Sequence, residues 1–288
     1  MIVFHKAAAI NPFLQQQKAL NKRIGFVPTM GALHDGHLSL IEQCRQNCDI
    51  VVSSIFVNPT QFNDPSDLEK YPRTTEADIQ KLYEAGCDVV FLPAVAEIYP
   101  PSYKPPHYPL GEIETLLEGA YRPGHFQGVC QVLDRLFEIV NPQEVFFGQK
   151  DYQQCMVVKK LLTLVPAHQS IHMHICPIVR EADGLAMSSR NRRLSETERQ
   201  KAVTIYQTMQ QIKKDIRPGE TAPLVQKATD NLVQAGFKPD YVSIAQASDL
   251  HALSSWDGHT ALVVLIAAYL GDVRLIDNEL LPDSLTGS

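Results

Sequence analysis

Two histidines, His34 and His37, lie three residues apart in the segment HDGH, between a short apolar run and an amphipathic stretch. The pattern predicts a strand that turns into a helix, with Asp35 as the N-cap. The first N–H groups of such a helix are unpaired, and Gly31 and Gly36 let the backbone approach a ligand closely. Because imidazoles donate hydrogen bonds to phosphoryl oxygens, we expect a phosphate site here. The alternative is two surface histidines beside a turn.

A lysine follows a second predicted strand, in the segment FFGQKDYQQ. A cation such as Lys150 at the start of a helix opposes the helix dipole, at a cost of a few tenths to about 1 kcal/mol. A bound anion reverses that penalty, so Lys150 is predicted to bind phosphate; a solvated lysine is the alternative. Gln154 lies one turn later, on the same face of the helix.

A serine-rich loop, GLAMSSRN, places two hydroxyls next to a guanidinium at Ser188, Ser189 and Arg190. Its position between two differently patterned parts of the chain indicates a lid that grips a polyphosphate. Another cation and imidazole, Arg122 and His125, stand on a Gly/Pro loop, and the sequence assigns them no role.

A polar turn follows a third predicted strand in SSIFVNPTQF. Asn58 and Gln61 are expected to hydrogen-bond a small polar substrate there, with Met30 and Phe62 as the apolar walls of its pocket. An ordinary surface loop is the alternative.

The composition is that of an ordinary globular protein, with 288 residues, 44% hydrophobic and 20% charged. A net charge of −6 argues against a nucleic-acid binder. The longest apolar run, Ala261 to Leu270, is about half a membrane span, and the N-terminal residues do not resemble a signal peptide. We therefore expect a cytoplasmic protein. Its six cysteines lack a CxxC motif and indicate buried reduced thiols, although Cys44 and Cys48 at i,i+4 also fit a metal pair.

Alternating apolar strands and helical patterns in the first part of the chain predict an α/β fold. Such a fold has a parallel sheet with right-handed crossovers, and its ligands bind beyond the carboxyl ends of the strands. The predicted strands are Ile24–Val27, Ile50–Val57, Val89–Leu92, Val145–Phe147 and Ile171–Val179. The predicted helices are Leu38–Cys48, Thr75–Ala85, Gln127–Val140 and Lys150–Leu164.

The pattern changes near residue 180, which predicts a Rossmann-like domain over residues 1–178 and a smaller α+β lid domain over 179–288. The polar stretch Arg180–Arg193 is the expected hinge. A capping box at Ser195 opens a helix that is expected to reach Ile216. The remaining predicted elements are a helix over Ala222–Ala235 and strands over Tyr241–Ala245, Ala261–Tyr269 and Val273–Ile276.

Seven segments, spread in order over nearly the whole chain, resemble the pantothenate synthetase (pantoate–β-alanine ligase) family of HxGH nucleotidyltransferases. HxGH alone indicates only the superfamily, whereas FVNPTQF together with GQKDYQQ and SSRN indicates this family. The segments are PTMGALHDGH, SIFVNPTQF, YPRT, LEGAYRPGHFQGV, FFGQKDYQQ, DGLAMSSRN and AAYLGDVRLIDN.

The resemblance implies ATP-dependent condensation of pantoate with β-alanine through a pantoyl-adenylate, by a homodimer that uses Mg²⁺. It implies catalytic roles for His34, His37 and Lys150, and pantoate or β-alanine contacts for Gln61 and Gln154. The residues that it places on ATP are Met30, Gly31, Ala32, Leu33, His34, Asp35, Gly36, His37, Gly148, Gln149, Lys150, Asp151, Val179, Met187, Ser188, Ser189 and Arg190.

The magnesium site is implied by carboxylates that follow the YPRT segment in the family. Here that stretch reads Thr75-Glu76-Ala77-Asp78, so one acidic position is alanine and Asp78 is the expected ligand.

Two other functions remain open at this point. Another HxGH nucleotidyltransferase, which transfers an adenylyl or cytidylyl group to a small metabolite, would share the histidines without needing the two glutamines. A non-catalytic nucleotide sensor on the same fold is the second, although the presence of both His37 and Lys150 disfavours it.

Overall fold

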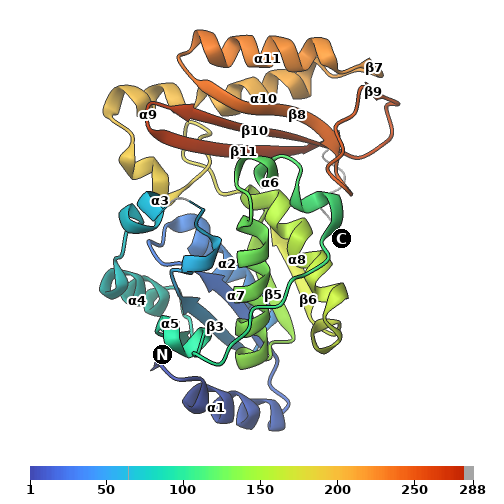
Figure 1. The fold of residues 1–288 in the computed structure, drawn as a ribbon. Helices are drawn as coiled ribbons and strands as arrows, with labels where there is room; N and C mark the ends of the chain where they lie inside the picture. Colours follow the sequence, from blue (N-terminus) through green and yellow to red (C-terminus); the bar gives the residue numbers. More distant parts are fainter. Residues whose placement is uncertain (64, 282–288) are drawn as a thin grey trace.

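The computed structural model describes residues 1–63 and 65–281, and its first part is built on a six-stranded parallel sheet (Figure 1). The expected α/β class is confirmed. In spatial order the strands are β1 (Ile2–Phe4), β4 (Val89–Phe91), β3 (Ile50–Ile55), β2 (Ile24–Thr29), β5 (Glu144–Gly148) and β6 (His172–Cys176).

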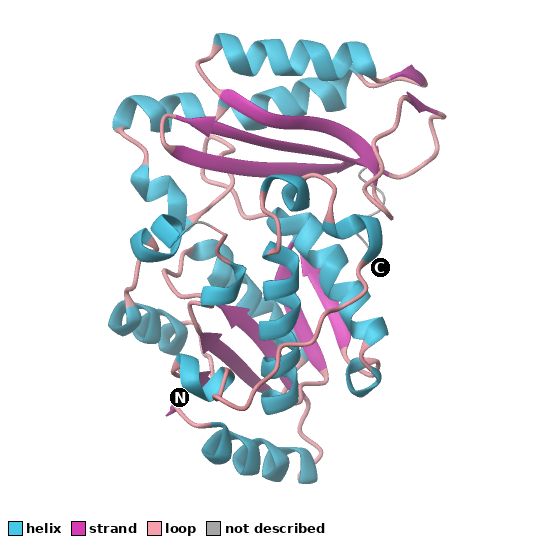
Figure 2. Cartoon of the chain, viewed as in Figure 1, coloured by secondary structure: helices cyan, strands magenta, loops and turns pink. Residues whose placement is uncertain are grey.

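Helices cover both faces of this sheet (Figure 2). Successive side chains of a strand point to opposite faces, so Phe26 packs in the core beneath α1, α7 and α8, whereas Val27 packs beneath α2 and α4. The helices are α1 (Ala7–Ala19), α2 (Asp35–Asn47), α3 (Pro65–Lys70), α4 (Thr75–Glu84), α5 (Val95–Ile98), α6 (Glu118–Tyr121), α7 (His125–Val140) and α8 (Tyr152–Leu164). Short 3₁₀ turns are η1 (Pro59–Gln61), η2 (Gly111–Glu114), η3 (Gln149–Asp151) and η4 (Pro166–His168).

The strand order reverses between β2 and β5. The chain moves from β2 to β3 and β4 on one side, then crosses back to place β5 on the other side of β2. In an open parallel sheet, this reversal leaves a crevice beyond the carboxyl ends of the two neighbouring strands. The segment with His34 and His37 follows β2, and the segment with Lys150 follows β5, so the topology brings both to one crevice.

A three-stranded antiparallel sheet, in the order β11-β10-β8, lies across this end of the parallel sheet (Figure 1). One face of β10 packs under α10 and α11 through Val264 and Ile266, and its other face joins the core of α7 and α8 through Val263 and Leu265. The elements of this part are η5 (Ser189–Arg193), α9 (Glu196–Ala202), α10 (Thr204–Asp215), β7 (Gly219–Glu220), α11 (Ala222–Gln234), β8 (Lys238–Gln246), β9 (Ser255–Trp256), β10 (Leu262–Leu270) and β11 (Val273–Leu281).

Several elements differ from the sequence expectation. The helix expected to reach Ile216 is interrupted at Val203, which separates α9 from α10. The strand expected to reach Val179 ends at Cys176, because Pro177 has no N–H to donate to a neighbouring strand. The elements β1 and α1 were not predicted; β1 has three residues, and α1 contains Pro12, which normally argues against a helix. The short elements α3, α5, α6, β7 and β9 were not predicted either.

The two parts of the chain are bonded to each other beside the crevice. The Asn278 side chain on β11 donates to the backbone oxygens of Gln149 (2.9 Å) and Lys150 (2.8 Å). Glu118 on α6 accepts two bonds from the Arg274 guanidinium, at 2.7 and 2.8 Å, and one from the Tyr241 hydroxyl at 2.7 Å. These contacts tie the antiparallel sheet to the strand ends that it covers.

Substituting Glu118→Ala is expected to lower the free energy of unfolding by about 3 kcal/mol, because it leaves the guanidinium of Arg274 buried without its main partner. Urea denaturation measures the change. The control is Glu138→Ala, which breaks an ion pair whose carboxylate is 65% exposed and is expected to change stability by less than about 1 kcal/mol. Equal effects of the two substitutions would contradict the expectation.

Candidate active site

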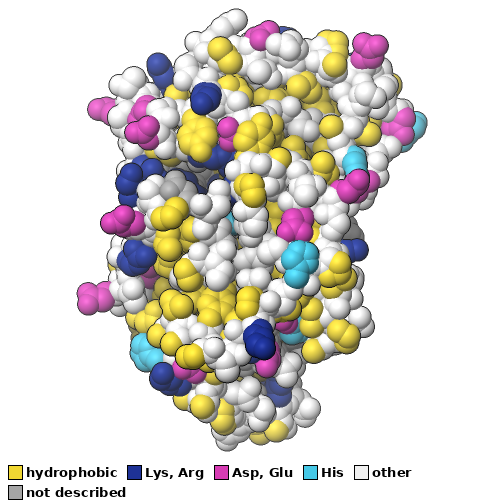
Figure 3. Space-filling model, in the orientation of Figure 1, with side chains coloured by type: hydrophobic (Ala, Val, Ile, Leu, Met, Phe, Trp, Pro, Cys, Tyr) yellow, Lys and Arg dark blue, Asp and Glu magenta, His cyan; other side chains and the backbone are white. Residues whose placement is uncertain are grey.

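An inner hollow of about 220 Å³ lies at the crevice between the ends of β2 and β5. It opens beside a larger outer hollow of about 600 Å³, and both are lined by Lys150, Asp151, Ser188 and Arg190. Figure 3 shows Lys and Arg side chains gathered where the two parts of the molecule meet. The sequence-predicted residues that line the inner hollow are Met30, His34, Gly36, His37, Asn58, Gln61, Gly148, Lys150, Asp151, Gln154, Val179, Met187, Ser188, Ser189 and Arg190.

The two histidines form a contact pair at the start of α2, with ring centroids 4.1 Å apart. The backbone N–H of His34 donates to Nδ1 of His37 at 3.3 Å. Neutral His37 therefore carries its proton on Nε2. Nδ1 of His34 is buried and has no hydrogen-bond partner within the described residues.

Both imidazoles are held in the neutral form. Burial, followed by the positive charge of Lys150, lowers the pKa of His34 to about 4. Burial, then the neighbouring His34, lowers the pKa of His37 to about 3, with Lys150 and Lys81 adding to the effect. A bound phosphate would oppose all of these influences, because a nearby negative charge favours the imidazolium form.

The turn before the histidines is held by Asp78 of α4. Gly31 and Ala32 both have positive φ angles, 81° and 52°, and the second is a costly conformation for a residue with a side chain. The Asp78 carboxylate accepts from the N–H of Ala32 at 2.9 Å, the N–H of Leu33 at 2.8 Å and the hydroxyl of Thr74 at 3.0 Å. This buried carboxylate offsets the cost of the turn.

The structure bears differently on the expected roles of Asp78 and Asp35. Both oxygens of Asp78 accept hydrogen bonds from protein donors, and its role as a magnesium ligand stays a prediction. Across residues 1–63 and 65–281, no three His, Cys, Asp or Glu side chains are grouped to hold a metal ion. The prediction that Asp35 caps α2 was wrong by one residue: the helix begins at Asp35, and His34 holds the cap position.

Five of the residues expected at ATP lie behind the wall of the hollow rather than on it. Gly31, Ala32 and Leu33 form the buried turn, and Asp35 is exposed. Gln149 is buried, and its side-chain amide donates to the Asn278 side chain at 3.2 Å. Their expected contacts with ATP stay a prediction.

The expected lid loop lines the hollow together with the start of α2. The hydroxyl oxygen of Ser188 accepts from the N–H of Arg190 at 3.3 Å and caps η5. Arg190 donates to the Asp67 carboxylate at 2.9 Å, and the Ser189 hydroxyl contacts the phenol of Tyr71. The loop thus lies against α3 and its flanking residues, next to Lys150.

Gln61 is held by a chain of polar contacts that gives His125 a role. Its side-chain oxygen accepts from Asn58 at 3.0 Å, and its amide lies 3.3 Å from the sulfur of Met30. Nδ1 of His125 donates to the backbone oxygen of Gln61 at 2.8 Å, which leaves Nε2 to accept from Arg122 at 3.3 Å. Burial, with the charge of Arg122, lowers the pKa of His125 to about 4, so this arrangement is stable at neutral pH.

The apolar wall of the inner hollow differs from the sequence expectation. Met30 lines it as predicted, but Phe62 does not; Phe62 packs on Tyr71, with ring centroids 5.7 Å apart, and Tyr71 takes its place. Part of the wall comes from one face of α7, which sequence reasoning treated only as a core helix. These α7 residues are Val129, Val132, Leu133 and Leu136.

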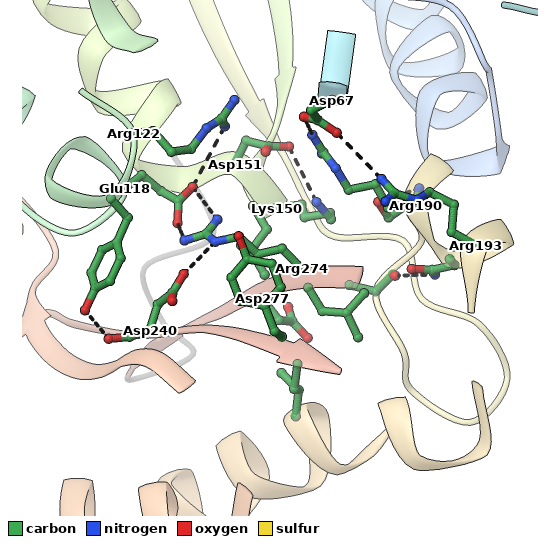
Figure 4. A pocket seen from close by; sticks show the side chains of 18 of the residues that line it. Asp67, Glu118, Arg122, Lys150, Asp151, Arg190, Arg193, Asp240, Arg274 and Asp277 are labelled. Atoms are coloured by element: carbon green, nitrogen blue, oxygen red, sulfur yellow. Dashed lines mark hydrogen bonds and ion pairs between the residues drawn. The ribbon is translucent and has the colours of Figure 1, made fainter. Parts of the chain in front are cut away.

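The outer hollow is lined by charged groups of both signs (Figure 4). Arg122 and Arg274 point at Glu118, while Arg190 and Arg193 reach Asp67. The Lys150 ammonium lies 3.9 Å from Asp151, beyond hydrogen-bond distance. Lys150 is therefore placed to bind an anion from either hollow.

The Pantoate-beta-alanine ligase family model matches residues 2–280 of this chain. The pantothenate synthetase of Porphyromonas gingivalis is 44% identical over 281 residues, 96% of this chain and 98% of the relative. That of Pseudomonas fluorescens is 47% identical over 260 residues, 89% of this chain and 90% of the relative. The chain belongs to the pantoate–beta-alanine ligase family.

Solved structures of the family share the fold described above. Pantothenate synthetase from Thermus thermophilus superposes with a TM-score of 0.88 at 38% identity, covering 97% of this chain and 99% of that one. The Francisella tularensis pantoate–beta-alanine ligase, complexed with beta-gamma ATP and beta-alanine, has a TM-score of 0.79 at 36% identity and covers 97% of each chain. In residues 1–63 and 65–281 of the present protein, no helix is long and apolar enough to cross a bilayer.

In the unliganded protein, both crevice histidines are expected to titrate below pH 5, because burial and neighbouring cations disfavour the imidazolium. An NMR titration of ¹⁵N-labelled histidine measures the midpoints. His251 is the internal control, since its carboxylate neighbours Glu112 and Asp249 raise its pKa.

Adding inorganic triphosphate is expected to raise both crevice midpoints and leave that of His251 unchanged. A midpoint near 6.5 for His34 or His37 without ligand would refute the account of their electrostatics.

Proposed function

We propose that the chain joins pantoate to β-alanine, with ATP as the activating substrate, and releases pantothenate, AMP and pyrophosphate. The observation that supports this most directly is a single crevice that unites the two imidazoles, Lys150 and the side chains of Gln61 and Gln154. Membership of the family supports the choice of substrates.

In the first step, a carboxylate oxygen of pantoate attacks the α-phosphorus of ATP. A bond forms between that oxygen and phosphorus, and the bond to the β-phosphate oxygen breaks, giving pantoyl-adenylate and pyrophosphate. Both reactants are anions, so the protein has to neutralise charge and hold them in line. The Nε2–H of His37 and the N-terminus of α2 suit the α-phosphate, and Lys150 with Ser188 and Ser189 suits the departing pyrophosphate.

The inner hollow suits pantoate. This substrate carries a carboxylate, two hydroxyls and a carbon with two methyl groups. The amides of Gln61 and Gln154 supply donors and acceptors for the polar groups, and the face of α7 supplies an apolar surface for the methyls. A nucleotidyltransferase for an unrelated metabolite would not need this combination.

In the second step, the neutral amine of β-alanine attacks the acyl carbon, AMP leaves, and the amine loses a proton. The outer hollow, of about 600 Å³, opens beside the inner one and gives the second substrate a route to the acyl carbon. The loop of Ser188 to Arg190 lies over the shared boundary and limits the entry of water, which would hydrolyse the adenylate.

We also propose that the protein is a cytoplasmic homodimer and that residues 179–288 form the lid domain. We propose further that Mg²⁺ binds together with the triphosphate of ATP. Magnesium commonly binds through substrate phosphates with few protein ligands, which fits the absence of a ligand cluster among the described residues. It would neutralise phosphate charge when bound. The oligomeric state is measured by light scattering.

The test of the function is AMP release from a mixture of ATP, pantoate and β-alanine, with each substrate omitted in turn. Pantoate-dependent exchange of pyrophosphate into ATP without β-alanine is expected, since the adenylate forms first. A rival nucleotidyltransferase would show no dependence on pantoate, and a sensor would bind ATP without releasing AMP.

Replacing Lys150 by alanine is expected to cost about 2–4 kcal/mol in transition-state stabilisation, seen as a loss in kcat/KM, because the ammonium faces the leaving phosphates. Lys160→Ala, on the exposed face of α8, is the control and should leave kcat/KM unchanged. A loss below threefold for Lys150→Ala would remove this residue from the reaction.

Gln154→Ala is expected to raise the KM for pantoate at least tenfold and the KM for ATP less than threefold, since the amide lies at the pantoate end of the hollow. Steady-state kinetics with each substrate varied measure both constants. Gln226→Ala, which changes an exposed glutamine of α11, is the matched control. Equal changes in the two constants would contradict the assignment.

A further inference from the structure

The peptide group between Leu33 and His34 is bonded at both ends by functional side chains. The Lys81 ammonium, from α4, donates to the carbonyl oxygen of Leu33 at 2.6 Å. The N–H of the same peptide group belongs to His34 and donates to Nδ1 of His37 at 3.3 Å. A half-buried cation is thus separated from the crevice imidazole by a single peptide unit.

One turn of α4 holds this peptide in place. Lys81 and Asp78 are three residues apart and therefore lie on the same face of the helix. Asp78 accepts from the N–H of Leu33 at 2.8 Å, while Lys81 donates to the carbonyl of the same residue. Both backbone polar groups of Leu33 are hydrogen-bonded to side chains of α4, so the peptide group that follows Leu33 has a fixed orientation.

We propose that Lys81 is a positioning residue that acts on His37 through the Leu33–His34 peptide, fixing which ring nitrogen carries the proton and keeping the ring neutral. A cation on a carbonyl oxygen polarises the amide and strengthens its N–H as a donor. A stronger donor facing Nδ1 disfavours a proton on that nitrogen. The proton of neutral His37 then stays on Nε2.

The charge of Lys81 acts on His37 in the same direction as two other neighbours. His34, Lys150 and Lys81 each lower the pKa of His37. The carboxylates of Asp35 and Asp151 oppose this effect on His34, and Arg192 on η5 also lowers the pKa of His34. Asp78 on α4 is a further acidic neighbour, bonded to the N–H of Leu33. Lys81 differs from the others because it lies outside the crevice lining, so a ligand does not neutralise it by direct contact.

The test compares three substitutions at one position by NMR of the unliganded protein. Lys81→Met removes both the donor and the charge, Lys81→Gln keeps a donor, and Lys81→Arg keeps both. Lys22→Met is the control for loss of a lysine, because it lies just before β2, at the end of the strand far from the crevice. The readouts are the ¹⁵N shifts of His37, which report its tautomer, and its titration midpoint.

Lys81→Met is expected to give a mixture of His37 tautomers and to raise its titration midpoint by about half a pH unit or more. Lys81→Gln is expected to raise the midpoint while preserving the Nε2–H tautomer. Lys81→Arg and Lys22→Met are expected to match the parent protein. If Lys81→Met fails to fold, as judged by loss of the His251 signal, the proposal is tested by the titration midpoint of His37 in Lys81→Gln.

The kinetic consequence rests on the proposed function and is measured separately. The rate of adenylate formation is expected to fall about tenfold in Lys81→Met with less than a threefold change in the KM for ATP, and to recover in Lys81→Arg. Parental NMR parameters in both Lys81→Met and Lys81→Gln would overturn the proposal whatever the activity. An inactive parent protein with the expected NMR changes would instead overturn the proposed function alone.

Discussion

The structure of the crevice depends on one buried carboxylate. Asp78 accepts from two consecutive N–H groups in a turn where Gly31 and Ala32 have left-handed backbone angles. Without those bonds, the turn would carry unpaired buried amides as well as a strained alanine, and the chain could leave β2 in a different direction. Because the turn is fixed, α2 begins at Asp35, and His37 folds back onto the backbone of His34. The position of both imidazoles follows from an interaction made 46 residues away along the chain.

The second half of the crevice is fixed in the same manner from another part of the sequence. Lys150 lies in the turn that follows β5. Asn278 of β11 holds this turn by donating to the carbonyl groups of Gln149 and Lys150. Parallel strand topology brings the two turns together, and side chains from α4 and β11 make each turn rigid. Rigid positioning matters here because a reaction between two anions depends on donors that are already in place.

The sequence was sufficient for the parts of this arrangement that follow from local pattern. The central strands β2, β3, β4 and β5, the helices α2, α4, α7 and α8, the histidine pair and Lys150 were visible as periodicity followed by turn residues, and the family motifs added the lid loop. The supporting contacts were not visible. The resemblance implied a magnesium ligand at Asp78, and nothing near this residue in the chain shows that its oxygens also hold the turn after β2. Tyr71 in place of Phe62, and the wall formed by α7, likewise depend on packing between distant segments, which a local pattern does not encode.

Asn278 also separates the supports of two groups that line the same hollows. Its side chain bridges the antiparallel sheet to the backbone on either side of the peptide bond between Gln149 and Lys150. The loop of Ser188 to Arg190 is held instead by Asp67 of α3 and by Tyr71. The ammonium and the two serine hydroxyls are therefore anchored to different parts of the fold, so a substitution in β11 and one in α3 would disturb them independently.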